Sequence, residues 1–483
     1  MRRPVAALAV VLLAGCPPRK ESPHTGLLDP VSCDTPLRET VLPSDMVEDL
    51  GTLAVGSMAR FSVPTGTSSF LIFSQEAGSS APPTVVASGI TIPNAVVPTN
   101  LRAPDGTLYY DDFAAWPSTT IGGFSYFDVT GLLAFDYGFQ RVSGGLPVPN
   151  TSAALDRMRA AGGLQPGTWT FTVNDWAYLC PFEGCADGHA ASRYRVQVVT
   201  RGGGGSAPVP DTGTLEVEVY LATDVTSDLP TAAVADANAQ VARWKQSLAA
   251  YLGNAGLTLG GVHFNDLPAS VKERYAPAGR VDVTSTDPCG ALGQLFTSAT
   301  VQKRAVHVFL ADALVAPTLG AFRVAGVDGS IPGPSGFPGT VYGGAVVGLP
   351  DFGFEASPGA CAASGAPSLS TCGTDRVAYV TAHEIGHWLG LFHTTEQDGT
   401  LFDPISDTAP CPCEGCAAAN KLAGCAETGI AKPTTFVTND RCVASDSCGG
   451  GRNLMFWLLD DRYSTGELSS DQAQIVRLNP AVR

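Results

Sequence analysis

The sequence predicts an all-β sandwich followed by an α+β domain, which holds a mixed sheet, a histidine-bearing helix and a C-terminal helix. Three observations support this fold class. Residues 41–200 contain short alternating strands separated by Gly/Pro turns, with little helical periodicity. A glycine run followed by proline within residues 201–213 is typical of a flexible linker between domains. In residues 214–483, strand and helix patterns alternate, as in a mixed sheet backed by helices.

The composition limits the class of protein. The 483 residues suffice for two or three domains, and 44% of them are hydrophobic, so sizeable cores can be buried. Charged residues make up only 15%, while 54 glycines and 36 prolines favour a β-rich, loop-rich extracellular architecture. The 29 basic and 45 acidic residues give a net charge of −16, which argues against nucleic-acid binding through a basic face.

The first 15 residues predict an export signal. Arg2 and Arg3 precede a short apolar segment, Val5 to Ala14, which is too short to span a bilayer as a stable helix. The sequence Leu13-Ala14-Gly15-Cys16 resembles the bacterial lipoprotein box, which implies cleavage before Cys16 and a lipid anchor on its thiol. An ordinary secretory signal followed by an unrelated cysteine is the alternative. Residues 16–40 are rich in proline and polar residues, and we expect them to be a tether.

Cysteine usage favours disulfides. Without Cys16, 12 of the 13 cysteines remain, and an even number in an exported protein favours pairing. Nearness along the chain suggests the pairs Cys180–Cys185 and Cys361–Cys372.

Six further cysteines crowd between residues 411 and 448. In an exported protein they predict a loop stapled by disulfides. A second metal site that uses Cys411, Cys413 and Cys416 is the alternative.

The C-terminal domain begins with an alternating strand at Thr214–Leu221, followed by a helix at Ala232–Leu252. Thr258–Phe264 and Ala305–Leu310 read as further strands. The segment Val341–Leu349 lies just before the histidine-bearing helix, and we expect it to be a strand, either at the edge of the sheet or in its interior.

The sequence His383-Glu384-Ile385-Gly386-His387-Trp388-Leu389-Gly390-Leu391-Phe392-His393 reads H-E-x-x-H-x-x-G-x-x-H. Residues four apart share one helix face, so His383 and His387 can aim at one point. Gly390 can turn the chain and bring His393 to the same point. Three imidazoles with an open fourth position are typical of a catalytic zinc, and Glu384 is placed to act as the general base. Thr374 or Asp375 is expected to cap the start of this helix.

This motif resembles the long zinc signature of the metzincin metalloproteases. The resemblance implies a metzincin-like fold for residues 214–483 and a zinc-dependent peptidase activity. It also implies a methionine in a tight turn beneath the metal, and Met455 in Asn453-Leu454-Met455 fits that place. Many relatives carry tyrosine two residues after the methionine, where it helps to stabilise the oxyanion. This chain has Trp457 there, and Tyr463 is the candidate substitute.

An acidic stretch ending in Asp407-Thr408-Ala409-Pro410 resembles the pappalysin, or cytophagalysin, branch of the metzincins, which usually has Asp-Thr-Pro without the inserted alanine. Asp398, Asp403 and Asp407 supply hard oxygens that suit Ca²⁺. A solvated loop capped by its own aspartates is the alternative.

The N-terminal strands loosely resemble the jelly-roll modules attached to bacterial secreted proteases, through Leu101–Thr107 and Pro166–Trp169. Residues 41–200 are therefore expected to be a binding or spacer module, or else a pro-domain that covers the active site.

The sequence predicts a zinc endopeptidase of the cell envelope, attached to the outer membrane or cell surface through Cys16 and acting on protein or peptide substrates. Two alternatives stay open. One is an envelope lipoprotein that binds a glycan or a protein and keeps a non-catalytic metal site. The other is a zinc amidase that acts on cell-wall peptides.

Overall fold

The computed structural model describes residues 37–77, 84–87, 90–93, 96–110, 132–133, 143–175, 192–202, 209–222, 229, 231–275, 280–283, 290–315, 324–362, 365–397, 399, 402–411, 437–443 and 449–483. All structural statements concern these residues. They form a mixed α/β protein with several sheets.

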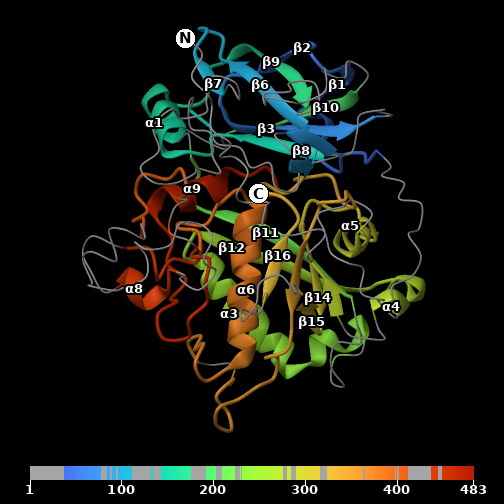
Figure 1. The fold of residues 1–483 in the computed structure, drawn as a ribbon. Helices are drawn as coiled ribbons and strands as arrows, with labels where there is room; N and C mark the ends of the chain where they lie inside the picture. The colour runs from blue at the N-terminus through green and yellow to red at the C-terminus, as the bar shows by residue number, and fades with distance from the viewer. Residues whose placement is uncertain are drawn as a thin grey trace.

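Two four-stranded antiparallel sheets make up most of the N-terminal region, drawn in blue and teal in Figure 1. Phe70 lies at the centre of their core, with its ring edge-on to those of Phe61 and Trp169 at 5.0 Å in both cases. One sheet has the order β1 (Val47–Ala54), β10 (Arg193–Gly202), β3 (Thr67–Glu76), β8 (Ser143–Val148), and the other β2 (Met58–Val63), β9 (Gly167–Asp175), β6 (Val96–Arg102), β7 (Leu108–Tyr110). A hairpin of β4 (Thr84–Ala87) and β5 (Ile90–Pro93) and the 3-10 helix η1 (Ser44–Met46) complete the region.

The sequence predicts an all-β N-terminal region. This prediction is wrong in one respect, because the region also contains helix α1 (Ser152–Ala161). The hydroxyl of Thr151 accepts the N–H of Ala154 and caps the start of the helix, and Gly162 ends it with a φ of 71°. Its apolar face is small, since it depends mainly on Leu155 and Met158, and so its helical period is weak.

The C-terminal region holds a five-stranded mixed sheet, which confirms the predicted sheet type. Four strands are parallel and the last, β16, is antiparallel. The order is β12 (Leu257–Asp266), β11 (Gly213–Leu221), β14 (Val306–Ala311), β17 (Ala345–Gly348), β16 (Gly326–Asp328), and a separate parallel pair is formed by β13 (Arg280–Asp282) and β15 (Ala313–Val315).

The position of β17 answers the question left open for residues 341–349. This strand pairs with β14 on one side and β16 on the other, so it is interior. The edge strand next to it is Gly326–Asp328, which has only three residues and so cannot show an alternating pattern.

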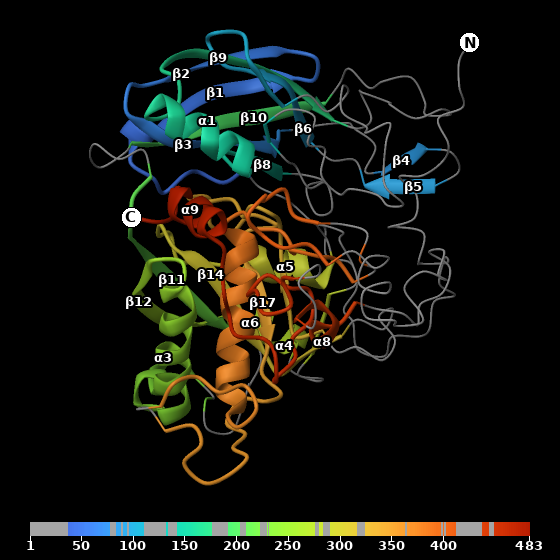
Figure 2. The same ribbon diagram turned by 90° about the vertical axis from the view of Figure 1, so that its left-hand side faces the viewer.

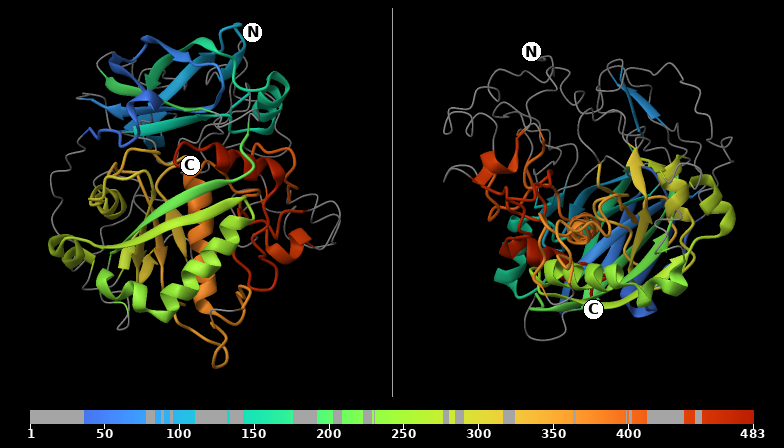
Figure 3. Two further views of the ribbon diagram at one scale, coloured as in Figure 1. Left: turned by 180° about the vertical axis from the view of Figure 1, so that it is seen from behind. Right: turned by 90° about the horizontal axis from the view of Figure 1, so that it is seen from below.

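Helices cover both faces of this sheet. Val217 and Val219 of β11 face α3 and α6, which lie side by side (Figures 2 and 3), while Tyr220 points to the opposite face, where Phe296 of α5 packs. The helical elements of this region are η2 (Ala232–Ala237), α3 (Ala239–Gly253), α4 (Ala269–Tyr275), α5 (Ala291–Thr297), α6 (Gly373–Trp388), α8 (Asn439–Val443) and α9 (Ser470–Leu478).

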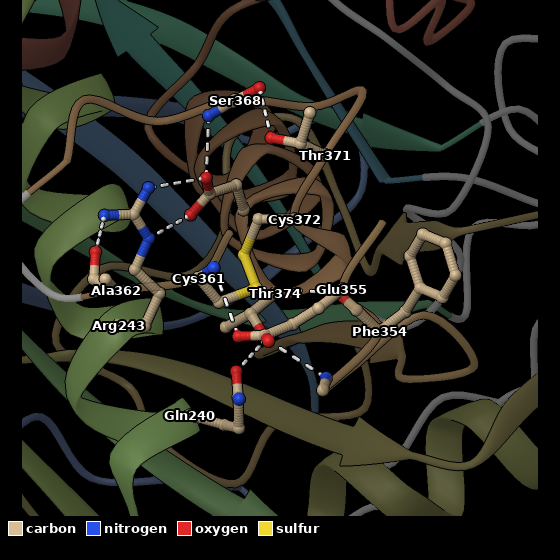
Figure 4. Close-up of a disulfide and its surroundings, with 12 residues drawn as sticks. Gln240, Arg243, Phe354, Glu355, Cys361, Ala362, Ser368, Thr371, Cys372 and Thr374 are labelled. Carbon is tan, nitrogen blue, oxygen red and sulfur yellow. Dashed lines mark hydrogen bonds and ion pairs between the residues drawn. A yellow bond between two sulfur atoms is a disulfide. The ribbon is translucent and has the colours of Figure 1, made fainter. Parts of the chain in front are cut away.

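Helix α6 begins after Cys372 with no side-chain cap, so the prediction that Thr374 or Asp375 caps it is wrong. The carboxylate of Asp375 instead forms a bidentate ion pair with Arg243 of α3, with two N–O distances of 2.7 Å (Figure 4). Both side chains are almost fully buried. The predicted disulfide Cys361–Cys372 is present and closes the loop beside this pair.

The buried ion pair predicts a large difference between two neighbouring positions on α3. Removing Arg243 leaves the Asp375 charge buried without a partner, so Arg243→Ala should lower the free energy of unfolding by about 3–5 kcal/mol. Lys245→Ala, which breaks an exposed pair with Asp236, should leave the unfolding midpoint close to that of the wild type. Urea unfolding followed by circular dichroism measures both, and equal midpoints for the two variants would contradict the prediction.

Candidate metal centre

The three histidines of the sequence motif meet at one point. His383 and His387 lie one turn apart on α6, which ends at Trp388. Gly390 then adopts a φ of 110°, and the chain turns back to bring in His393. The Nε2 atom of His387 lies 3.1 Å from those of His383 and His393, which are 3.2 Å from each other. This cluster satisfies the geometry of a metal site.

A hydrogen-bond acceptor at Nδ1 fixes the tautomer of each ring. Nδ1 of His383 donates to the carbonyl of Leu454 at 2.6 Å, and Nδ1 of His387 donates to the carbonyl of Leu391 at 2.7 Å. A carbonyl oxygen only accepts, so each Nδ1 carries the proton and each Nε2 has a lone pair. Nδ1 of His393 donates to the Glu396 carboxylate at 2.8 Å, with the same consequence.

Three lone pairs that face one another repel unless a cation lies between them. Nitrogen ligands at tetrahedral angles around one ion, each 2.0–2.1 Å from it, are separated by roughly 3.3 Å. The observed separations of 3.1–3.2 Å are close to this value. The three rings therefore fit a small tetrahedral metal ion.

Burial keeps the rings of His383 and His387 neutral. It lowers the pKa of His383 to about 3 and holds that of His387 well below its usual range, with the neighbouring rings adding to both shifts. Neutral imidazole is the form that binds a metal. These two rings are therefore in the metal-binding form at neutral pH.

Glu384 is held between α6 and the edge strand β16. Its side chain is almost fully buried, and it accepts a hydrogen bond from the backbone N–H of Asp328. A Cβ atom at Gly326 would lie 2.4 Å from its Oε1, so any larger residue there would have to displace the Glu384 side chain. Burial raises the pKa of Glu384 to about 8.

Met455 packs against helix α6, one residue after Leu454, whose carbonyl accepts Nδ1–H of His383. It is fully buried, and a Cβ atom at Gly386 of α6 would lie 2.5 Å from its sulfur. The Met455 carbonyl accepts the N–H of Thr394, next to the third histidine, at 3.0 Å. The turn around Met455 therefore contacts both the helix and the segment that carries His393.

Trp457 and Tyr463 make other contacts. The indole N–H of Trp457 donates to the Val437 carbonyl at 2.8 Å, and its ring packs against the cluster that contains the disulfide Cys411–Cys442. Tyr463 lies under the guanidinium of Arg462, 5.1 Å from the ring centre.

The two described aspartates of the predicted calcium site face α9. Asp403 accepts from the Thr408 hydroxyl at 2.5 Å and from the Gln472 amide at 3.3 Å, and burial raises its pKa to about 7. Asp407 accepts the backbone N–H of Asp471 at 3.0 Å. Asp398 lies outside the described residues, so calcium binding stays a prediction.

The second disulfide, Cys411–Cys442, confirms that the cysteine-rich segment is stapled, and it engages Cys411, which the alternative metal site required. Two disulfides suggest an extracellular or otherwise oxidising compartment. Cys16, the pair Cys180–Cys185, Cys413 and Cys416 lie outside the described residues. Among the helices that the structure does describe, none has both the length and the apolar character needed to cross a membrane.

No protein family model matches this chain, and no curated protein matches it.

Glu396 and Gly326 are functional candidates that sequence reasoning missed. Glu396 follows His393 by three residues, and an acidic residue so close to a ligand was a usable signal. Gly326 is far from the motif in sequence, and the carbonyls of Leu391 and Leu454 belong to backbone groups that every residue has. The residue types of Gly326, Leu391 and Leu454 therefore give no indication of their roles at the site.

The contact between Glu396 and His393 predicts an effect on metal affinity. Glu396→Ala removes the acceptor that orients the third ring, so the affinity for Zn²⁺ should fall by roughly 10- to 100-fold. Competition with a chromophoric chelator measures the dissociation constant. Glu273→Ala, at an exposed site on α4, is the control. Unchanged affinity in Glu396→Ala would refute the role.

Proposed function

We propose that this chain is a zinc-dependent endopeptidase of the metzincin type, most similar to the pappalysin branch, which is exported as a lipoprotein anchored through Cys16. The observation that carries the proposal is the convergence of three Nε2 atoms, each with its lone pair directed inward, beside the carboxylate of Glu384. Such a set of neutral imidazoles with a carboxylate next to them is typical of hydrolytic zinc sites.

His383, His387 and His393 would hold the ion. A zinc ion bound there would supply a Lewis acid that acidifies water and polarises a carbonyl group. Glu384, which the positive charge of the bound ion would keep ionised, would take up the proton that the water loses as it attacks the peptide carbon. The same carboxyl group then delivers this proton to the amine nitrogen as the C–N bond breaks. Burial against β16 keeps Glu384 in place for both transfers.

The edge strand β16 supports a peptide as the substrate. It is the last strand of the sheet, and its residue Gly326 lies against Glu384. An extended peptide that pairs with the outer edge of β16 would bring its backbone past the metal, which is recognition by strand addition. With an anchor at Cys16, the substrates would be extracellular or envelope proteins.

Replacing the proposed base tests the function directly. Glu384→Ala should keep Zn²⁺, because the three histidines remain, and should lose roughly 10²- to 10⁴-fold in peptide-bond hydrolysis. Metal content by atomic emission and cleavage of a fluorogenic casein measure the two effects separately. Full peptidase activity in this zinc-loaded variant would exclude the proposal.

Gly326 gives an independent test. A methyl group there would push against Glu384 Oε1, so Gly326→Ala should lower kcat by roughly 10²-fold while zinc content stays the same. Gly348→Ala on the neighbouring strand β17 is the matched control, since its Cβ would meet other atoms only at 3.5 Å or more. A kcat for Gly326→Ala equal to that of the control would show that β16 does not position Glu384.

A further inference from the structure

Helix α9 joins the N-terminal sheets to the metal centre. In Figure 2 it lies between the sheets above and the end of α6 below. From the N-terminal side, the hydroxyl of Ser69 on β3 donates to the Leu478 carbonyl at the end of α9, at 2.5 Å. Ile475 and Val476 of α9 belong to one hydrophobic cluster that also contains core residues of both regions. The helix therefore packs against the N-terminal region.

The start of α9 is held by helix α1. The carboxylate of Asp471 accepts a hydrogen bond from the Ser152 hydroxyl and forms an ion pair with Arg159. Ser152 also accepts the N–H of Ser406 at 2.9 Å, and its own N–H donates to the Pro404 carbonyl at 3.4 Å. These contacts connect α1 both to α9 and to the loop that follows the third histidine.

From α9, hydrogen bonds continue to the metal ligands. Gln472, next to Asp471, accepts the side-chain amide of Asn453 at 2.8 Å. The other end of that amide accepts the N–H of Met455 at 2.8 Å, which fixes the turn. The Leu454 carbonyl lies between these two residues and accepts Nδ1–H of His383. The orientation of a metal ligand thus depends on a turn that α9 holds.

We propose that the N-terminal β region is a permanent part of the metal centre, in which Ser152 and Arg159 act as positioning residues for His383 through α9. This proposal is incompatible with a pro-domain that leaves on activation. Without α1, the Asp471 carboxylate loses its cation, and the nine-residue helix would have to keep Gln472 in place through its own capping box and the contacts with Asp403 and Asp407. This inference rests on the metal site of the proposed function but does not require peptidase activity.

The test compares two arginines on the same helix. Arg159 crosses to Asp471, whereas Arg157 pairs with Asp105 inside the N-terminal region at 2.8 Å. We expect the full-length double variant Ser152→Ala/Arg159→Ala to bind Co²⁺ on the order of tenfold more weakly, and to show an altered visible spectrum of the bound Co²⁺. Arg157→Ala should match the wild type in both respects, and Arg159→Lys, which keeps the charge, should retain most of the affinity.

These readouts separate positioning from simple stability. A lower melting temperature with unchanged Co²⁺ affinity and spectrum would overturn the proposal. Weaker Co²⁺ binding by the folded double variant, with rescue in Arg159→Lys, supports it even if no peptide is cleaved, whereas failure of the proposed peptidase would appear as inactivity of the wild type.

A second experiment tests the proposal if the double variant does not fold. A specific protease site inserted between residues 204 and 205 allows the purified, zinc-loaded full-length chain to be cut. We expect the two pieces to co-elute in size-exclusion chromatography and to retain zinc. Separation of the pieces, with zinc kept by residues 205–483, would overturn the proposal.

Discussion

Three imidazoles can present unprotonated nitrogens to one point only if three acceptors hold their protons on the opposite side, and the rest of the site depends on this constraint. Leu391 and Glu396 are local acceptors, since they lie close to the motif in sequence. The third acceptor, the carbonyl of Leu454, comes from 71 residues beyond His383. The histidine motif is therefore necessary for the centre but not sufficient, because a distant turn must be in place to orient its first ligand.

The sequence predicts the parts of the centre that depend on local geometry. Helical spacing brings His383 and His387 together, and Gly390 allows the turn to His393, whereas Met455 was implied only by the resemblance of the motif. The role of β16 was missed because a strand of three residues is too short to show an alternating pattern. The role of Gly326 was missed because its closeness to Glu384 depends on tertiary packing. The prediction of the α6 cap was wrong for a related reason, since Asp375 forms an ion pair with Arg243 from another helix.

In the N-terminal half, the antiparallel strands could be predicted from alternation, but neither α1 nor its contacts could. Ser152 and Arg159 reach Asp471 across 319 and 312 residues. No local pattern marks such a pair, because serine, arginine and aspartate are ordinary surface residues in a sequence. Only the folded chain shows that this half packs against α9, the same helix that holds the turn around Met455 (Figure 2).

The two disulfides are out of reach in the folded protein. Cys372, Cys411 and Cys442 have 0% of their surface exposed, and Cys361 has 6%. An oxidant or a reductant can meet these sulfur atoms only while the surrounding loops are open. Both cross-links therefore form either before the final packing of the chain or during a later local opening of these loops. Once that packing is complete, their lifetime in a reducing medium is set by how often the loops open locally, and the reactivity of the reductant becomes secondary.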